Sequence, residues 1–187
     1  MPLSRVKKGV GALFAELPTS EKVLHGLSLV WVLLQIISSN FMHVHADTLW
    51  GNINLMAKFH VYSGLCLLPI TLVFVYHVIK RRTIADMYPW LFGHFSQIKK
   101  DINVLRTLRL PESHPAGLAA TVEGLGLLAL LLALVTGTLW YLGASNAGTS
   151  PQLLEIHKTS VGLIEAYFYA HGAMGLLHLL QWWRTKP

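Results

Sequence analysis

Four long apolar runs dominate this 187-residue sequence and restrict its fold more than any other feature. They cover about residues 24–42, 57–79, 118–142 and 153–181. A helix of about 20 residues crosses the hydrocarbon core of a bilayer, and each run is of about that length or longer. Because lipid offers no partner for an unpaired backbone group, helix is the expected state of each run. We therefore predict an all-α membrane protein, a four-transmembrane-helix bundle that forms one domain over residues 1–187.

The composition agrees with a membrane protein. The chain is 53% hydrophobic and only 13% charged, whereas soluble domains average about 25% charged residues. It holds one cysteine, Cys66, which excludes an internal disulfide and the C-x-x-C-H motif for covalent haem attachment.

The basic residues predict the orientation of the bundle. Thirteen of the fifteen lie before the first run, between the second and third, or after the fourth, and only Lys58 and Lys158 lie in the opposite loops. Cytoplasmic loops carry an excess of lysine and arginine. We therefore expect both termini and residues 80–117 to be cytoplasmic, in a multi-pass protein of the bacterial inner membrane. The net charge of +6 then reflects topology, and no nucleic-acid partner is expected.

A signal peptide is the competing interpretation of the first run. The sequence Val44-His45-Ala46 has the small-x-small pattern that precedes a cleavage site. The apolar run and the residues before it are both long for a signal peptide, so we expect a retained span.

The loop over residues 80–117 contains an amphipathic segment. Apolar residues recur there at helical spacing with basic residues between them, and we expect Pro111 and Pro115 to end the helix. The apolar positions are Phe95, Ile98, Ile102, Leu105 and Leu108. Such a helix lies on the inner membrane surface or docks on a partner subunit, and the pattern fits both.

Four histidines lie inside or at the ends of the predicted spans, where ionisable side chains are costly and usually functional. With a cytoplasmic amino terminus, His25 falls near the inner face and His60 near the outer face. In the fourth span His157 lies near the outer face, and His171 follows on nearly the same helix face about 21 Å deeper. The histidines therefore form two pairs matched in depth, His25 with His171 and His60 with His157.

Two imidazole pairs between helices suit two b-type haems with histidine on both sides of each iron. Gly64 and Gly175 each follow a paired histidine by four residues. Each shares a helix face with that histidine and is a candidate for packing against a porphyrin. Close packing between helices is the other use of glycine in membrane helices.

With these features the chain resembles the bacterial cytochrome b561 group, which includes the di-haem cytochrome b of nickel-hydrogenase and formate-dehydrogenase type. The segment from His60 to Gly64 (HVYSG) is similar to that family's outer-haem helix. His157-Lys-Thr, followed by His171 and His178, is similar to its last helix. In the family tryptophan commonly follows the first-helix histidine, where this chain has Gly26.

The resemblance implies two haem b groups, with His25 and His171 holding the inner one and His60 and His157 the outer one. It implies electron transfer across the membrane to or from ubiquinone or menaquinone. Two forms stay open: a membrane-anchor subunit of a larger dehydrogenase or reductase, and a free-standing oxidoreductase similar to the superoxide:quinone branch. A reductase subunit or a periplasmic electron carrier is then the expected partner. A histidine-bearing transporter of metal or protons is the alternative from another class.

Further polar groups have open roles. His178 is a candidate contact for quinone or a haem propionate, or an ordinary interfacial histidine. Buried carboxylates in lipid are paired, neutral or on a proton path. The other positions without an assigned role are His43, His45, His77, His94, Glu123 and Glu165.

Overall fold

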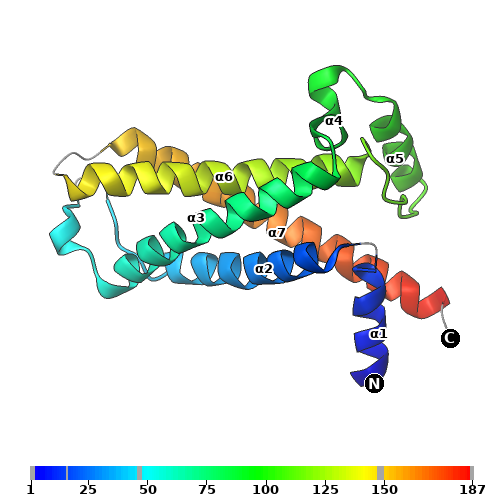
Figure 1. Cartoon of the computed structure of the whole chain (residues 1–187), viewed down its shortest axis with the longest axis horizontal. Coiled ribbons are helices and arrows are strands. Elements are labelled where there is room, and N and C mark those ends of the chain that lie inside the picture. Colours follow the sequence, from blue (N-terminus) through cyan, green and yellow to red (C-terminus); the bar gives the residue numbers. More distant parts are fainter. Residues whose placement is uncertain (1–2, 16, 46–47, 147–149, 186–187) are drawn as a thin grey trace.

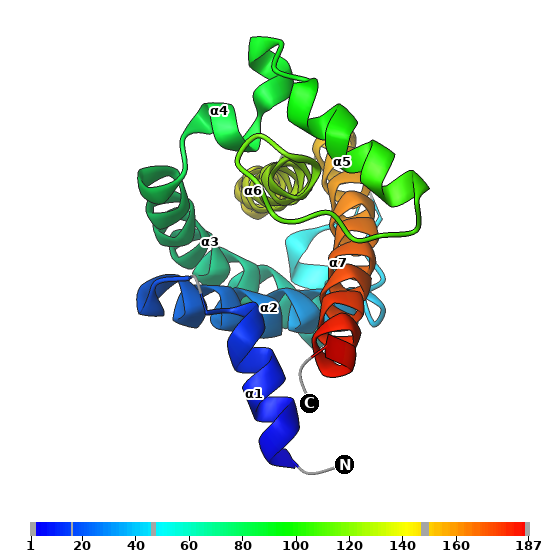
Figure 2. The same cartoon turned by 90° about the vertical axis from the view of Figure 1, so that its right-hand side faces the viewer.

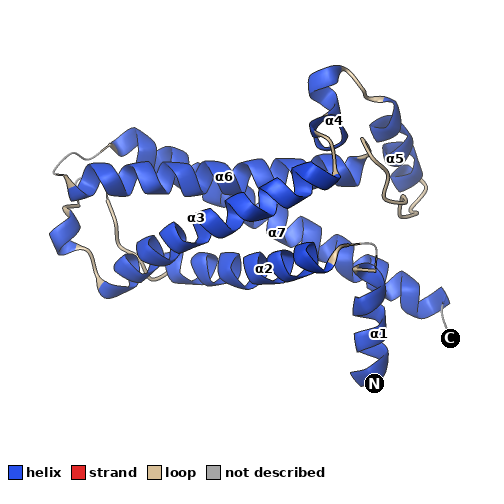
Figure 3. Ribbon diagram, in the orientation of Figure 1, coloured by secondary structure: helices blue, strands red, loops and turns tan. Residues whose placement is uncertain are grey.

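The computed structural model describes residues 3–15, 17–45, 48–146 and 150–185, and within these ranges the chain contains helices and no strand (Figure 3). In chain order the helices are α1 (Leu3–Leu13), α2 (Thr19–Ser39), η1 (Trp50–Asn52), α3 (Leu55–Arg81), α4 (Ile84–Met87), η2 (Pro89–Phe92), α5 (Ser96–Arg106), α6 (Leu118–Ser145) and α7 (Pro151–Thr185). The predicted all-α class is confirmed. Ala46, in the suspected cleavage site, and Lys186, one of the counted basic residues, lie outside the described residues.

Within the described ranges, three helices, α2, α3 and α6, are long and apolar enough to cross a membrane. The fourth predicted span corresponds to α7, which has 35 residues and is long enough to span a bilayer. Its polar residues, among them His157, Glu165 and His171, make it less apolar than the other three. That α7 crosses the membrane, and that both termini are cytoplasmic, stay predictions.

The four long helices pack around a shared apolar core. Figure 1 shows α2 and α6 running lengthwise with α3 and α7 inclined to them, and Figure 2 looks along α6 with the others around it. Buried residues from all four helices form the core. They are Val32, Leu67, Ala129, Ala133, Leu134 and Ile164. Alanines on α6 allow neighbouring backbones to approach closely, as small residues do in membrane helices.

The first apolar run extends to residue 42, but helix α2 ends at Ser39. Three polar side chains at this end bond back to the helix: Ser38 Oγ to the carbonyl of Gln35, and Ser39 Oγ and Asn40 Nδ2 to that of Ile36. Such side-chain bonds compete with the continuing backbone ladder. The hydropathy pattern does not register this competition, so the predicted end was three residues too late.

The connection between α3 and α6 differs from the single helix that the sequence predicted. It forms α4, η2 and α5, and α5 ends at Arg106 rather than at the prolines. Leu108 has a positive φ of 58° and is 97% exposed, so it is not part of the apolar helix face. A buried carboxylate, Asp101, instead faces α6 and accepts the backbone N–H of Leu118 at 2.7 Å. The carboxylate satisfies an otherwise unpaired N–H at the start of α6.

Tyr88 joins the start of this connection to α6 by a hydrogen bond. Its hydroxyl donates to the carbonyl oxygen of Gly124 at 2.8 Å, and burial raises the pKa of Tyr88 above its ordinary value. A Cβ at position 124 would lie 2.8 Å from the carbonyl oxygen of Met87. Glycine at this position therefore permits the close approach of α4 to α6.

Two ion pairs link the helices at the end of the bundle that carries both chain termini (Figure 1). Arg81 donates two hydrogen bonds to the carboxylate of Glu21, at 2.6 and 2.7 Å, and so joins α3 to α2. Arg82 donates to Glu123 at 2.8 Å and joins α3 to α6. Helix α1, which the sequence did not predict, projects away from the bundle at this end (Figure 1) and contacts α7.

Candidate functional site

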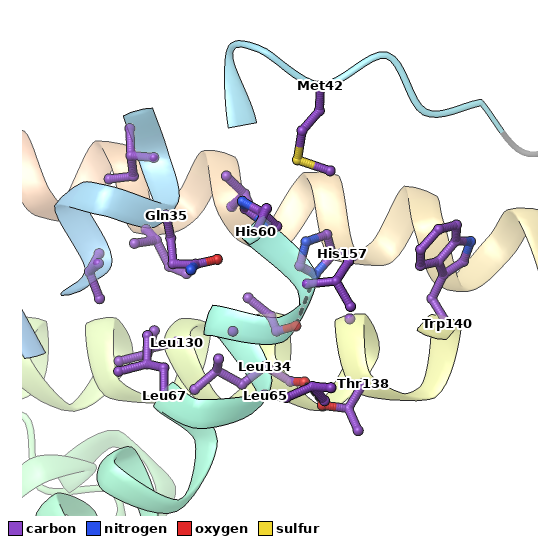
Figure 4. Close-up of a pocket in the computed structure, with 18 of the residues that line it drawn as sticks. Gln35, Met42, His60, Leu65, Leu67, Leu130, Leu134, Thr138, Trp140 and His157 are labelled. Carbon is purple, nitrogen blue, oxygen red and sulfur yellow. Dashed lines mark hydrogen bonds between the residues drawn. The ribbon is translucent and has the colours of Figure 1, made fainter. Parts of the chain in front are cut away.

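His60 and His157 face each other from α3 and α7 (Figure 4). Their ring centroids lie 6.3 Å apart and the ring planes are nearly perpendicular, at 87°. His60 is buried, with 8% of its surface exposed. Both line a pocket between α2, α3, α6 and α7. Its other walls are mainly apolar and include Leu65, Leu130, Leu134, Val161 and Gly64.

Hydrogen bonds determine which nitrogen of each imidazole is protonated. Ser38 Oγ already donates to the Gln35 carbonyl, so toward His60 Nδ1, 2.9 Å away, it acts as acceptor. His157 Nδ1 lies 2.9 Å from the carbonyl oxygen of Ala133, which can only accept (Figure 4). Both rings therefore carry their proton on Nδ1. Each leaves Nε2 with a free lone pair, the state in which an oriented imidazole binds a metal.

Gly137 makes room for His157. A Cβ built at this position would lie 2.9 Å from His157 Cε1 and 3.0 Å from Nδ1. The sequence interpretation missed Gly137 and the Ala133 carbonyl. Ala133 and Gly137 are four residues apart on α6, and this spacing of two small residues is the signal that could have found them.

His25 and His171 form the second pair, between α2 and α7. Their ring centroids lie 6.2 Å apart with an angle of 55° between planes. Neither imidazole has a hydrogen bond within the described part of the chain, and aromatic rings contact both. Phe14 and Phe74 pack on His25 at 5.5 and 6.3 Å, and Tyr167 stacks on His171.

The structure thus brings together the residues that the sequence paired by depth. His157 and His171 lie fourteen residues apart on the continuous helix α7, which corresponds to about 21 Å of helix rise. The His60–His157 pair is near the end of the bundle where α2 connects to α3 and α6 connects to α7. The His25–His171 pair is near the end with the termini.

The other predicted site residues are Gly64, Gly175 and His178. Gly64 lines the pocket, and a Cβ there would make an ordinary 3.5 Å contact with Gln35. At Gly175 an added Cβ would meet nothing within 4 Å. His178 is half-buried on α7, beyond His171.

The residues without an assigned role do not join either pair. His77 packs against Tyr76 and the exposed His94 against Phe92, while His43 and His45 are exposed. Glu123 is in the ion pair with Arg82, and Glu165 is half-buried on α7.

Both histidine pairs fit a metal held between two imidazoles. When each nitrogen lies about 2 Å from such a metal, the two ring centroids are roughly 6 Å apart, as in both pairs. The apolar pocket around the first pair suits a porphyrin. Trp140 also lines it, and the buried indole N–H has no partner among the described residues, so it can donate to a polar edge of a ligand. The residues present therefore fit haem with two histidine ligands.

Comparison with known proteins agrees with this chemistry. A family model described as prokaryotic cytochrome b561 matches residues 16–184, which include all four paired histidines and the four long helices except the last residue of α7. No match was found among curated proteins or among solved structures.

Proposed function

The chain belongs to the prokaryotic cytochrome b561 family, and from this premise we propose that it is a di-haem cytochrome that moves electrons across the bacterial inner membrane. Membership of the family makes it a membrane b-type cytochrome with a role in electron transfer. The number of haems, their ligands and the electron acceptor are the proposed part.

The observation that carries the proposal is the presence of two imidazole pairs at two depths of one bundle. Each pair has the ring separation that a shared iron needs. Haem supplies one-electron oxidation and reduction, and the protein holds its axial ligands and its apolar surroundings. His60 and His157 would hold one haem, and His25 and His171 the other. A spacing of about 21 Å along α7 then distributes the two redox centres across the membrane.

The distribution of the basic residues supports a proposed orientation of the bundle in the membrane. Twelve of the fourteen basic residues that the structure describes lie at the end of the bundle with the His25–His171 pair, which would make this the inner, cytoplasmic pair and His60–His157 the outer pair. Arg81 and Arg82 lie at this inner end, where their ion pairs hold α2, α3 and α6 together.

The site of quinone exchange is proposed at the inner end, beside His178. Reduction of ubiquinone or menaquinone consumes protons as well as electrons, so the site needs titratable groups near water. His178 is half-buried at this end, and histidine is the side chain that most often donates or accepts protons in enzymes. The protein would work either as the membrane subunit of a larger dehydrogenase or reductase, or alone as a quinone-linked oxidoreductase that accepts electrons from a periplasmic donor.

Haem stoichiometry tests the proposal. Purified protein should contain two haem b per chain with reduced b-type absorption bands. A chain without haem, or with one haem that all four histidine variants retain, would refute it. For quinone, His178→Ala should slow steady-state quinone reduction while both haems stay bound. The exposed His43→Ala serves as the matched control, and loss of turnover there alone would place the quinone site at the outer end.

A further inference from the structure

The aromatic ring of Tyr167 lies almost parallel to the imidazole of His171. The two residues are four positions apart on α7, so they share one helix face. Their ring centroids lie 5.1 Å apart with only 19° between planes, within the range of offset aromatic stacking. His25, which faces His171 from α2, is tilted from it by 55°.

A glycine on the neighbouring helix determines where the Tyr167 ring lies. A Cβ at Gly126 of α6 would lie 2.5 Å from Tyr167 Cδ2 and Cε2 and 2.6 Å from Cζ. Real Cβ contacts are essentially never that short, so any side chain at this position would displace the ring. The ring is therefore seated on the backbone of α6 on one side and stacked on His171 on the other.

This stacking contact is what orients the His171 imidazole. The torsion that rotates an imidazole plane has a broad energy profile, so a free ring would adopt a range of angles. In the outer pair, hydrogen bonds to Ser38 and Ala133 fix the rings. His171 has no hydrogen bond within the described ranges. The nearly parallel Tyr167 ring restricts the orientation of its imidazole plane instead.

We propose that Tyr167, seated by Gly126, is a positioning residue that fixes the plane of the His171 ligand and thereby the angle between the two imidazoles of the inner haem. The inference rests on the proposed function, because it takes His171 as an axial ligand. The angle between two axial imidazole planes controls the splitting of the iron d orbitals in the oxidised, low-spin state. The low-field g value in electron paramagnetic resonance (EPR) therefore responds to this angle.

The test is EPR spectroscopy of the oxidised, purified full-length protein, with haem content measured for each variant. Tyr167→Leu removes the flat ring and Gly126→Ala displaces it. Both should shift the low-field g value of one haem, or release that haem, and leave the signal of the other unchanged. Tyr167→Phe keeps the stacked ring and should retain the wild-type spectrum. The matched controls are Tyr169→Leu, at a side chain that is 69% exposed, and Gly172→Ala, where a Cβ meets nothing within 4 Å.

Two results would overturn the inference. Tyr167→Leu with both haems bound and an unchanged spectrum would show that the ring does not orient the ligand. A Tyr167→Phe spectrum shifted as far as that of Tyr167→Leu would assign the effect to the hydroxyl group instead of the stacked ring. Failure of the proposed function is distinguishable, because then the wild type lacks a second haem, or His171→Ala keeps both haems with unchanged signals.

Discussion

Replacement of Gly137 by alanine should weaken the outer haem selectively. The added Cβ would lie 2.9 Å from His157 Cε1, and an ordinary contact begins at 3.4 Å, so the imidazole must move by about 0.5 Å. The same Cβ would lie 3.0 Å from Nδ1, the nitrogen that bonds to the Ala133 carbonyl at 2.9 Å, so the movement disturbs this hydrogen bond. Overpacking of this kind costs about 1–3 kcal/mol. If all of this free energy is lost from haem binding, the dissociation constant of the outer haem rises by a factor of about 5 to 150.

The assay is the rate and extent of haem loss to an excess of a haem-scavenging apoprotein, followed by absorption. Gly137→Ala should lose one haem faster than wild type and keep the other at the wild-type rate. Gly162→Ala is the matched control, because Gly162 lies on α7 five residues after His157 and a Cβ there meets nothing within 4 Å. Identical loss from wild type and Gly137→Ala would refute the assignment of His157 as a ligand held against α6.

Three further predictions concern the outer histidines, the buried carboxylate of Glu21 and the membrane topology. His60→Ala and His157→Ala should each lower haem content from two to one per chain, since either leaves a single imidazole; full haem in both would contradict the outer pairing. Glu21→Ala removes a buried carboxylate that accepts two hydrogen bonds from an arginine and should destabilise the protein by about 1–3 kcal/mol. The measurement for both variants is thermal unfolding in detergent. Glu155→Ala, which breaks an exposed ion pair, is the control and should lower the free energy of unfolding by less than about 1 kcal/mol. Equal losses in the two variants would contradict this reasoning. Protease added outside intact spheroplasts should leave residues 80–117 uncut, and cleavage there would reverse the proposed topology.

The pairing of the histidines could be predicted because it depends only on helix geometry. Rise per residue and rotation per residue place His157 and His171 on one face of a helix, and the charge distribution places His25 and His60 at opposite depths. Every step uses properties of a single helix or of the membrane. The structure brings together the same two pairs.

The groups that hold the histidines could not be found in this way. The sequence interpretation chose Gly64 and Gly175 from their spacing to histidines on the same helix. The glycines that crowd a site side chain, Gly137 and Gly126, lie on α6, across the interface. Spacing along one helix does not give the register of two helices against each other. The acceptor Ser38 was missed for the same reason.

The two histidine pairs differ in their hydrogen bonds, and this difference predicts the order of the two haem potentials. A histidine that donates its Nδ1–H to an oxygen becomes a more basic ligand, and a more electron-rich ligand favours oxidised iron. Both outer histidines donate in this way, to Ser38 and to the Ala133 carbonyl. The inner histidines are contacted by aromatic rings instead. The outer haem should therefore have the lower midpoint potential.

Substitution of the serine acceptor tests this order. Ser38→Ala removes the partner of His60 Nδ1–H, a hydrogen bond of about 0.5–1.5 kcal/mol, and a bond made only in the oxidised state would correspond to an upper limit of roughly 20–60 mV in a one-electron couple. A redox titration should show the outer haem shifted upward by no more than that amount and the inner haem unchanged, with the outer signal identified by its absence in His60→Ala. Ser39→Ala is the matched control, because among the described residues that hydroxyl bonds to the carbonyl of Ile36 and not to a histidine. An outer potential above the inner one in wild type, or an unmoved outer potential in Ser38→Ala, would show that hydrogen bonding to the ligands does not determine the order.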